Sequence, residues 1–115
     1  MSEPKNPGRQ SQIQLNVQLD KDNVPENIQW QASDTDNVKN EAKAMLLGLW
    51  DKQNGNGISI DLWTKEMTVP EMNIFFYQTF LSMSDTILRA TRDKFVSDMI
   101  RNFATSFMDK VNSTG

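Results

Sequence analysis

ISIDLWTKEMTVPEMNIFFYQTFLSM, residues 58–83, is the stretch that decides the fold, because the spacing of its apolar residues changes from two to about 3.6. Residues 58–62 alternate between apolar and polar side chains, which predicts a strand with one buried face. Thr68 and Glu71 then have the spacing of a capping box, and Pro70 falls in the first turn of the helix that should follow. The sequence therefore predicts a strand that passes directly into a helix.

Two earlier segments show the same alternation of apolar and polar side chains. Residues 12–19 and 27–32 each place apolar residues on one side and amides on the other, which predicts two strands. Turn-forming residues around Pro25 separate these segments, so we expect a hairpin to join them. The polar side of the two strands consists of Gln12, Gln14, Asn16, Gln18, Asn27, Gln29 and Gln31.

Three segments have helical spacing. Residues 37–50 are predicted to form a first helix, which the Asn- and Gly-rich segment 53–57 would end. The helix that follows Thr68 carries apolar residues on two sides, so neighbours should cover both of them. The spacing breaks at residues 91–93, and a single apolar stripe from Phe95 to Val111 predicts a third helix. The apolar positions of the first helix are Val38, Ala42, Met45, Leu46 and Leu49.

The predicted order is strand, strand, helix, strand, helix, helix, which is an α+β fold. We expect one three-stranded antiparallel sheet with three helices on one face, because amides occupy the other face. The third strand, residues 58–62, would lie beside the first and antiparallel to it, or cross over to lie parallel to the second. A single domain is expected over residues 12–112, between a flexible N-terminal tail at 1–11, without a signal-peptide or anchor pattern, and a C-terminal tail at 113–115.

The positions of the large side chains predict how the helices pack. One apolar side of the second helix should lie on the third helix of the same chain, or on a second protomer in a homodimer. Trp30 and Trp50 lie in or beside apolar stripes and are expected in the core. The side of the second helix in question consists of Ile74, Tyr77, Leu81 and Leu88.

The composition argues against several kinds of chemistry. The chain has no Cys and no His, so disulfides, thiol nucleophiles and the usual general base are excluded, and we assign no cofactor and no metal site. A net charge of −3 argues against binding to nucleic acid or to an anionic membrane surface. The acids near Asp20 and Asp34 lack the Gly and Glu of a calcium loop, and we interpret them as turn and cap residues.

A resemblance to a known family rests on four stretches, which read VPENIQWQA, AMLLGLWD, IDLWTKEM and EMNIFFYQTFLSMSDTILRAT. From about Gln12 to Val111 the chain resembles the small gliding-motility protein GldC of gliding Bacteroidetes. The resemblance implies a cytoplasmic accessory protein of gliding motility, and it brings no catalytic motif. The chain has Tyr77 at a position where the family often has a His. It has Arg92 after Ala-Thr, where the family has a Gly. The second difference implies that the helix ends there without a glycine cap, or bends into the next helix.

Two classes of function remain after these exclusions. The first is a non-enzymatic protein-interaction module serving the motility or envelope machinery; the alternatives are a small carboxylate-using enzyme and a small-molecule carrier. An enzyme is disfavoured because the acids other than Asp61 fall in turns or on wet faces. Asp61 and Trp63 are out of phase with the apolar residues of their strand, so they should point into the open, amide-rich face of the sheet. The candidate partner surface therefore consists of Asp61, Trp63, Gln14 and Gln29.

Overall fold

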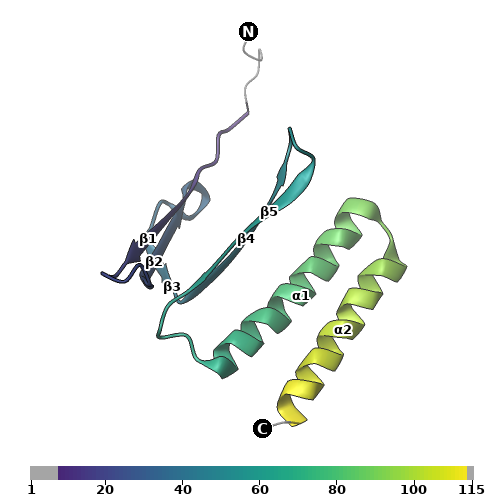
Figure 1. Ribbon diagram of the computed structural model, residues 1–115. Coiled ribbons are helices and arrows are strands. Elements are labelled where there is room, and N and C mark those ends of the chain that lie inside the picture. Colours follow the sequence, from purple (N-terminus) through teal and green to yellow (C-terminus); the bar gives the residue numbers. More distant parts are fainter. Residues whose placement is uncertain (1–7, 114–115) are drawn as a thin grey trace. The chain divides into compact units, whose positions relative to one another are not determined.

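The structure is a computed structural model that describes residues 8–113, so most of both predicted tails lies outside it. The described residues form five strands and two helices, which confirms the α+β class (Figure 1). All strands belong to one compact unit that ends at Glu66, and both helices belong to a second that begins at Met67. In chain order the elements are β1 (Ile13–Leu19), β2 (Pro25–Ala32), the 3-10 helix η1 (Ser33–Thr35), β3 (Asn40–Ala42), β4 (Ala44–Asp51), β5 (Asn56–Trp63), α1 (Val69–Thr91) and α2 (Lys94–Ser113).

The predicted hairpin of the first two strands is confirmed. β1 and β2 pair antiparallel, with Gln14 opposite Gln31 and Asn16 opposite Gln29. Since paired residues point to the same face, one face of this hairpin is a ladder of amides, as the alternation predicts. The other face includes Ile28, which is fully buried.

The prediction of a helix over residues 37–50 is wrong, because the segment forms β3 and β4. Its apolar residues fit a helical spacing, but Met45, Leu47 and Leu49 also alternate. In the structure these three lie opposite Leu62, Ile60 and Ile58 of β5. Cross-strand pairing with a segment further along the chain therefore overrides the local preference.

The segment 53–57 joins two strands instead of ending a helix. Gly55 adopts a left-handed φ of 63°, and its N–H donates to the carbonyl of Asp51 at 2.9 Å. The N–H of Asn54 donates to the carboxylate of Asp51 at 2.7 Å. Asn-Gly between alternating apolar residues is a signal of a β-hairpin, and here it makes the turn between β4 and β5.

The strands form two sheets, which corrects the prediction of one three-stranded sheet with three helices on one face. One sheet has the order β1-β2-β3, and the other consists of β4 and β5. Because β5 pairs with β4, neither predicted position of that strand, beside β1 or parallel to β2, is right. Only Lys43 separates β3 from β4, so one bent stretch of chain passes from the first sheet into the second.

Several side chains expected in the core are exposed. Trp50 is 73% exposed, because it lies near the hairpin end of β4, opposite Gly57. Ile58 and Ile60 were predicted on a buried face but remain more than 40% exposed. A two-stranded sheet has few neighbours to cover its side chains, which accounts for this exposure.

The start and end of α1 follow from local sequence. The capping box is present, since the N–H of Glu71 donates to the hydroxyl of Thr68 at 3.2 Å and the N–H of Thr68 donates to the carboxylate of Glu71 at 3.0 Å. The helix ends at Arg92, which is left-handed with φ 60° and donates its N–H to the carbonyl of Leu88 at 2.8 Å. The helix thus ends without a glycine, as the sequence implies.

The two helices form an antiparallel hairpin (Figure 1). They approach closely at Ser84 of α1 and Ser97 of α2, both of which are buried, while Ala104 is fully buried further along α2.

Of the side of α1 predicted to pack on α2, Tyr77 and Leu81 are half-buried, but Ile74 and Leu88 are 49% and 39% exposed. Phe80, which belongs to the other apolar side of α1, packs on Phe103 and Phe107 of α2 with ring centroids 5.2 and 5.3 Å apart. The predicted packing is therefore right only in part. Within residues 8–113 no helix has the length and apolarity needed to cross a membrane.

Candidate functional site

The structure distributes the predicted surface residues over both sheets. Gln14 lies on β1 and is exposed, and Gln29 lies on β2 and is half-buried. Asp61 and Trp63 lie on β5 of the second sheet, opposite Leu46 and Ala44. The amide-rich face and the Trp63 end of β5 therefore do not form one continuous sheet surface.

Asp61 and Trp63 lie beside a hollow in the surface of the strand unit. Trp63 is 58% exposed, and Asp61 is exposed as well. The hollow has a volume of about 260 Å³ and is lined by Val24, Pro25, Asp61, Leu62 and Trp63. Two segments far apart in sequence, the turn before β2 and the end of β5, thus meet at one place.

Asp20 shapes the turn that supplies Val24 and Pro25. Its carboxylate accepts hydrogen bonds from the N–H of Asp22 at 2.8 Å and from the N–H of Val24 at 3.0 Å. These backbone bonds, that of Val24 first, hold the pKa of Asp20 below its ordinary value of 3.8, and the Lys65 ammonium acts in the same direction. The interpretation of Asp20 as a turn residue is therefore confirmed.

The other side of the hollow is held by the residues that follow Trp63. Thr64 is buried, and its N–H and hydroxyl both donate to the carbonyl of Lys43, at 2.8 and 3.3 Å. Lys65 places its ammonium 3.6 Å from the carboxylate of Asp20. The backbone beside Trp63 is thus held at the β3–β4 junction through Thr64, while the exposed side chain of Lys65 forms an ion pair with the β1–β2 turn.

The arrangement suits recognition better than proton transfer. Asp61 is the only titratable side chain among the residues lining the hollow, whereas acid–base catalysis by carboxylates requires two converging groups. The other lining residues offer apolar area and an indole N–H. The hollow can therefore take an apolar side chain and provide one carboxylate acceptor beside it.

A second, more polar hollow lies next to Thr64. It has a volume of about 180 Å³ and includes Glu26, Glu41 and Glu66 together with Lys43. Among the described residues, no three acidic side chains are placed so that they could hold a metal ion. This hollow therefore offers no defined ligand set.

Reasoning from sequence identified Asp61 and Trp63 but missed Val24, Pro25 and Thr64. The alternation along residues 58–63 was enough to find the first two, because it depends on neighbouring residues alone. Asp20 at the head of a turn was a recognisable signal for the shape of the turn. No local signal indicates that this turn lies beside β5, which depends on how the strands pair.

One comparison with known proteins gives a match. The family model described as gliding motility-associated protein GldC-like matches residues 25–113, which is most of the chain. Comparison with curated proteins and with solved structures gives no match. The matched region runs from β2 to α2. It includes four of the five residues that line the hollow, all but Val24.

Proposed function

The chain belongs to the GldC-like family of gliding motility-associated proteins, and from that premise we propose that it is a non-enzymatic accessory protein that acts by binding another protein. The observation that carries the proposal is the exposed Trp63 next to Asp61, at the edge of a hollow with an anchored backbone. The partner is a protein of the motility or envelope machinery, and the binding takes place in the cytoplasm.

Trp63 has the properties of an interface anchor. A Trp that is 58% exposed keeps a large apolar area in water, which does not contribute to folding stability. Such residues dominate binding energy when a partner covers them. Asp is disfavoured in strands, so Asp61 is not explained by the stability of β5 either.

The size of the hollow favours a protein segment over a small molecule. Sites for small molecules usually enclose about 300–1,000 Å³, while the hollow at Trp63 is about 260 Å³ and open to the surface. Its volume suits one apolar side chain of a partner, with a donor from the same segment reaching Asp61. A carrier of small molecules and a carboxylate enzyme are therefore the weaker alternatives.

Trp50 supplies a matched control for the test of this proposal. Trp50 and Trp63 lie on the same face of the β4–β5 sheet, near opposite ends of it, and both are exposed. Trp63→Ala should lower stability by less than about 1 kcal/mol, because the side chain is mainly in water. Trp50→Ala should have a similarly small effect.

The experiment is recovery of partners from a gliding bacterium that expresses each tagged variant in place of its own protein. Wild type and Trp50→Ala should retain the same partner and support gliding, whereas Trp63→Ala should lose both. If Trp63→Ala retains the partner, or if the two variants lose it equally, the hollow is not the binding site. Unfolding curves of the purified variants establish that each is folded.

A further inference from the structure

The outer edge of β1 has no strand beside it in the part of the chain that the structure describes. β1 pairs with β2 alone, so it is an edge strand of its sheet. Gln12 shows which main-chain groups face β2, because its N–H donates to the hydroxyl of Ser33 and its carbonyl accepts from the N–H of Ser33, both at 3.0 Å. Main-chain groups of successive residues in a strand point to opposite edges. The N–H and C=O groups of Ile13, Leu15 and Val17 therefore point away from β2, along the outer edge.

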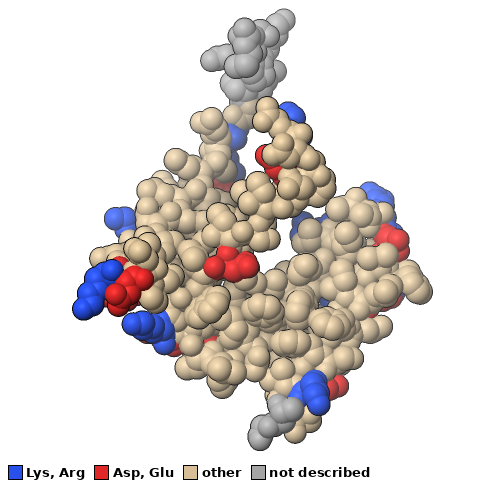
Figure 2. Space-filling view, viewed as in Figure 1, with Lys and Arg blue, Asp and Glu red and all other residues tan. Residues whose placement is uncertain are grey.

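β1 lacks the residues that usually protect an edge strand. Edge strands are commonly very short, or carry a charged residue or a Pro that prevents pairing with another chain. β1 has seven residues, its pairing with β2 is regular from Ile13 to Gln18, and the sequence has no charge and no Pro from Gln10 to Leu19. β3, at the other edge of the sheet, has only three residues and includes Glu41. Figure 2 shows acidic and basic side chains together at the β1–β2 turn, where the uncharged strand ends.

Neither helix of the chain can serve as the occupant of this edge. Main-chain N–H and C=O groups inside a helix are bonded within the helix. Neither α1 nor α2 can therefore form the ladder of hydrogen bonds that an open strand edge offers, whatever the position of the helical unit. The occupant must be an extended segment with an open edge of its own.

We propose that the outer edge of β1 pairs with β1 of a second copy of this chain, antiparallel, about a two-fold axis at Asn16. The strand reads IQLNVQL, with the same kind of residue at equal distances on either side of Asn16. The pairing therefore places Leu15 opposite Val17 of the second copy, Gln14 opposite Gln18, and Asn16 opposite its counterpart. A self-complementary edge of this kind is what a two-fold dimer requires.

The directions of the main-chain groups are consistent with this register. Leu15 and Val17 both point outward, so each can exchange two hydrogen bonds with the other residue in the second copy. Asn16 and its counterpart then form a non-hydrogen-bonded pair, with Cα atoms about 4.5 Å apart. A shift of the second strand by one residue would place outward-pointing groups opposite inward-pointing ones and aliphatic side chains opposite amides. The axis at Asn16 also pairs all seven residues of β1 with one another.

The charges at the two ends of β1 favour a second copy as the occupant. Arg9 precedes the strand, and the turn that follows it has a net charge of −1 from Asp20, Lys21 and Asp22. Antiparallel pairing brings the basic start of each copy beside the acidic turn of the other, with no charge in between. No residue of β1 lines the hollow at Trp63, so the proposed dimer and the partner at Trp63 can be tested separately.

The absence of Cys from the chain permits a direct test on the full-length protein. Asn16→Cys should form a disulfide-linked dimer under mild oxidation, because Cα atoms about 4.5 Å apart lie within the range of a disulfide. Gln14→Cys is the matched control, because Gln14 is exposed on the same face of the same strand. Its counterpart in the second copy would lie four residues further along, about 13 Å away, which is beyond the reach of a disulfide.

Two lysine substitutions test the strength of the association. In sedimentation equilibrium, Asn16→Lys should weaken self-association by about tenfold or more, because two like charges would lie directly opposite each other. Gln14→Lys adds the same charge but would lie opposite Gln18 of the second copy. It should leave the association nearly unchanged, because the two added charges would be about 13 Å apart, more than the Debye length of about 8 Å at physiological salt.

Each outcome decides for or against the pairing of β1 with its counterpart. A wild-type dimer, selective cross-linking of Asn16→Cys and weaker association of Asn16→Lys than of Gln14→Lys would support it. Wild type that stays monomeric at high micromolar concentration would overturn it, as would a dimer that Asn16→Lys leaves unchanged or equal cross-linking of Asn16→Cys and Gln14→Cys. Cross-linking of Asn16→Cys in cells to a different protein, without dimers, would assign the edge to that protein and also overturn the proposal. Circular dichroism verifies that each variant is folded.

Discussion

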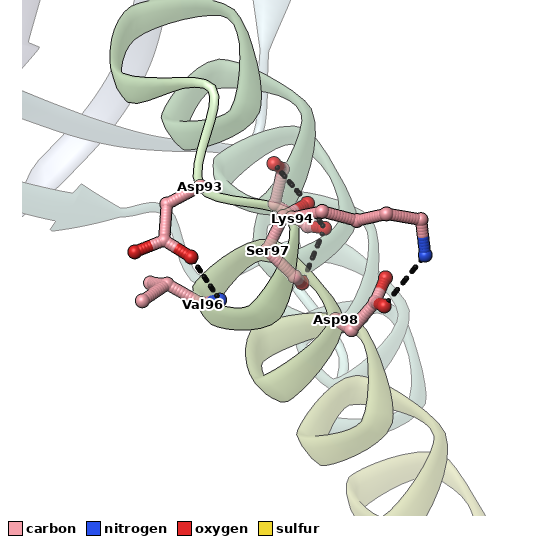
Figure 3. A network of polar contacts seen from close by, with 6 residues as sticks. Asp93, Lys94, Val96, Ser97 and Asp98 are labelled. Atoms are coloured by element: carbon pink, nitrogen blue, oxygen red, sulfur yellow. Dashed lines mark hydrogen bonds and ion pairs between the residues drawn. The ribbon is translucent and has the colours of Figure 1, made fainter.

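Ser84 and Ser97 allow a quantitative test of how the helical hairpin is held together. Each hydroxyl donates to the main-chain carbonyl of the other serine at 2.8 Å, and the two hydroxyl oxygens lie 2.9 Å apart. Figure 3 shows these bonds at Ser97, together with the bond from the N–H of Val96 to the carboxylate of Asp93 at the start of α2. Only small side chains allow two helix backbones to exchange such bonds.

We expect Ser84→Ala to lower the free energy of unfolding by about 0.5–1 kcal/mol. The loss of one buried hydrogen bond costs about 1 kcal/mol, and the higher helix propensity of Ala offsets up to about half of this. The carbonyl of Ser84 still accepts from Ser97, so no buried donor is left without an acceptor. Ser84→Leu should cost about 3 kcal/mol, because a large side chain at 0% exposure must force the helices apart.

Ser82→Ala is the matched control, because Ser82 is exposed on the same helix. It changes helix propensity alone and should be neutral or slightly stabilising. Urea unfolding followed by far-UV circular dichroism measures all three variants through the helical signal. Equal effects of Ser84→Ala and Ser82→Ala would refute the contribution of the serine pair, and tolerance of Ser84→Leu would refute the close approach of the helices.

Three further predictions concern the ends and turns of the fold. Thr68→Ala removes the hydroxyl of the capping box and should lower the free energy of unfolding by about 1 kcal/mol, measured by the same urea titration. Gly55→Ala should lower the free energy of unfolding by about 1 kcal/mol, because the residue has a φ of 63°, which strains a side chain even though the surrounding space is open. Gly48 has equally open surroundings and no positive φ, so Gly48→Ala should leave the thermal unfolding curve nearly unchanged. Since the pKa of Asp20 is lowered in the folded state, its carboxylate stabilises the fold above its unfolded pKa of 3.8, and this stabilisation is lost as the pH falls through the lower folded pKa. The melting temperature of Asp20→Asn should therefore lie below that of wild type at neutral pH and approach it in acid, and a difference that does not change with pH would contradict the assigned role.

The helices α1 and α2 could be predicted because their signals are local. The capping box at Thr68 involves residues three apart, and the positions of apolar residues along α2 repeat within one or two turns. The alternation of residues 13–19 likewise predicted β1 and its amide face. In each case the interaction that forms the element lies within a few residues, so sequence spacing alone contains the information.

The segment 44–51 shows where local spacing fails. Met45 and Leu49 satisfy a helical interval, while Met45, Leu47 and Leu49 satisfy the alternation of a strand. The choice depends on β5, which supplies both the hydrogen-bonding edge and the apolar partners of this strand. Because the segment forms a strand and not a helix, Trp50 lies at the surface instead of in the core, where it was expected.

The candidate site divides in the same way. Asp61 and Trp63 follow from alternation along β5, and the turn at Asp20 follows from its residue types. Their meeting around one hollow depends on Lys43, whose carbonyl binds Thr64 across 21 residues of chain. The sequence by itself determined the caps, the turns and the faces of individual elements, because short-range sterics and hydrogen bonds act between near neighbours. Only the tertiary structure decided which strands pair and which turn lies beside Trp63, because these depend on contacts between distant segments whose apolar patterns permit more than one partner.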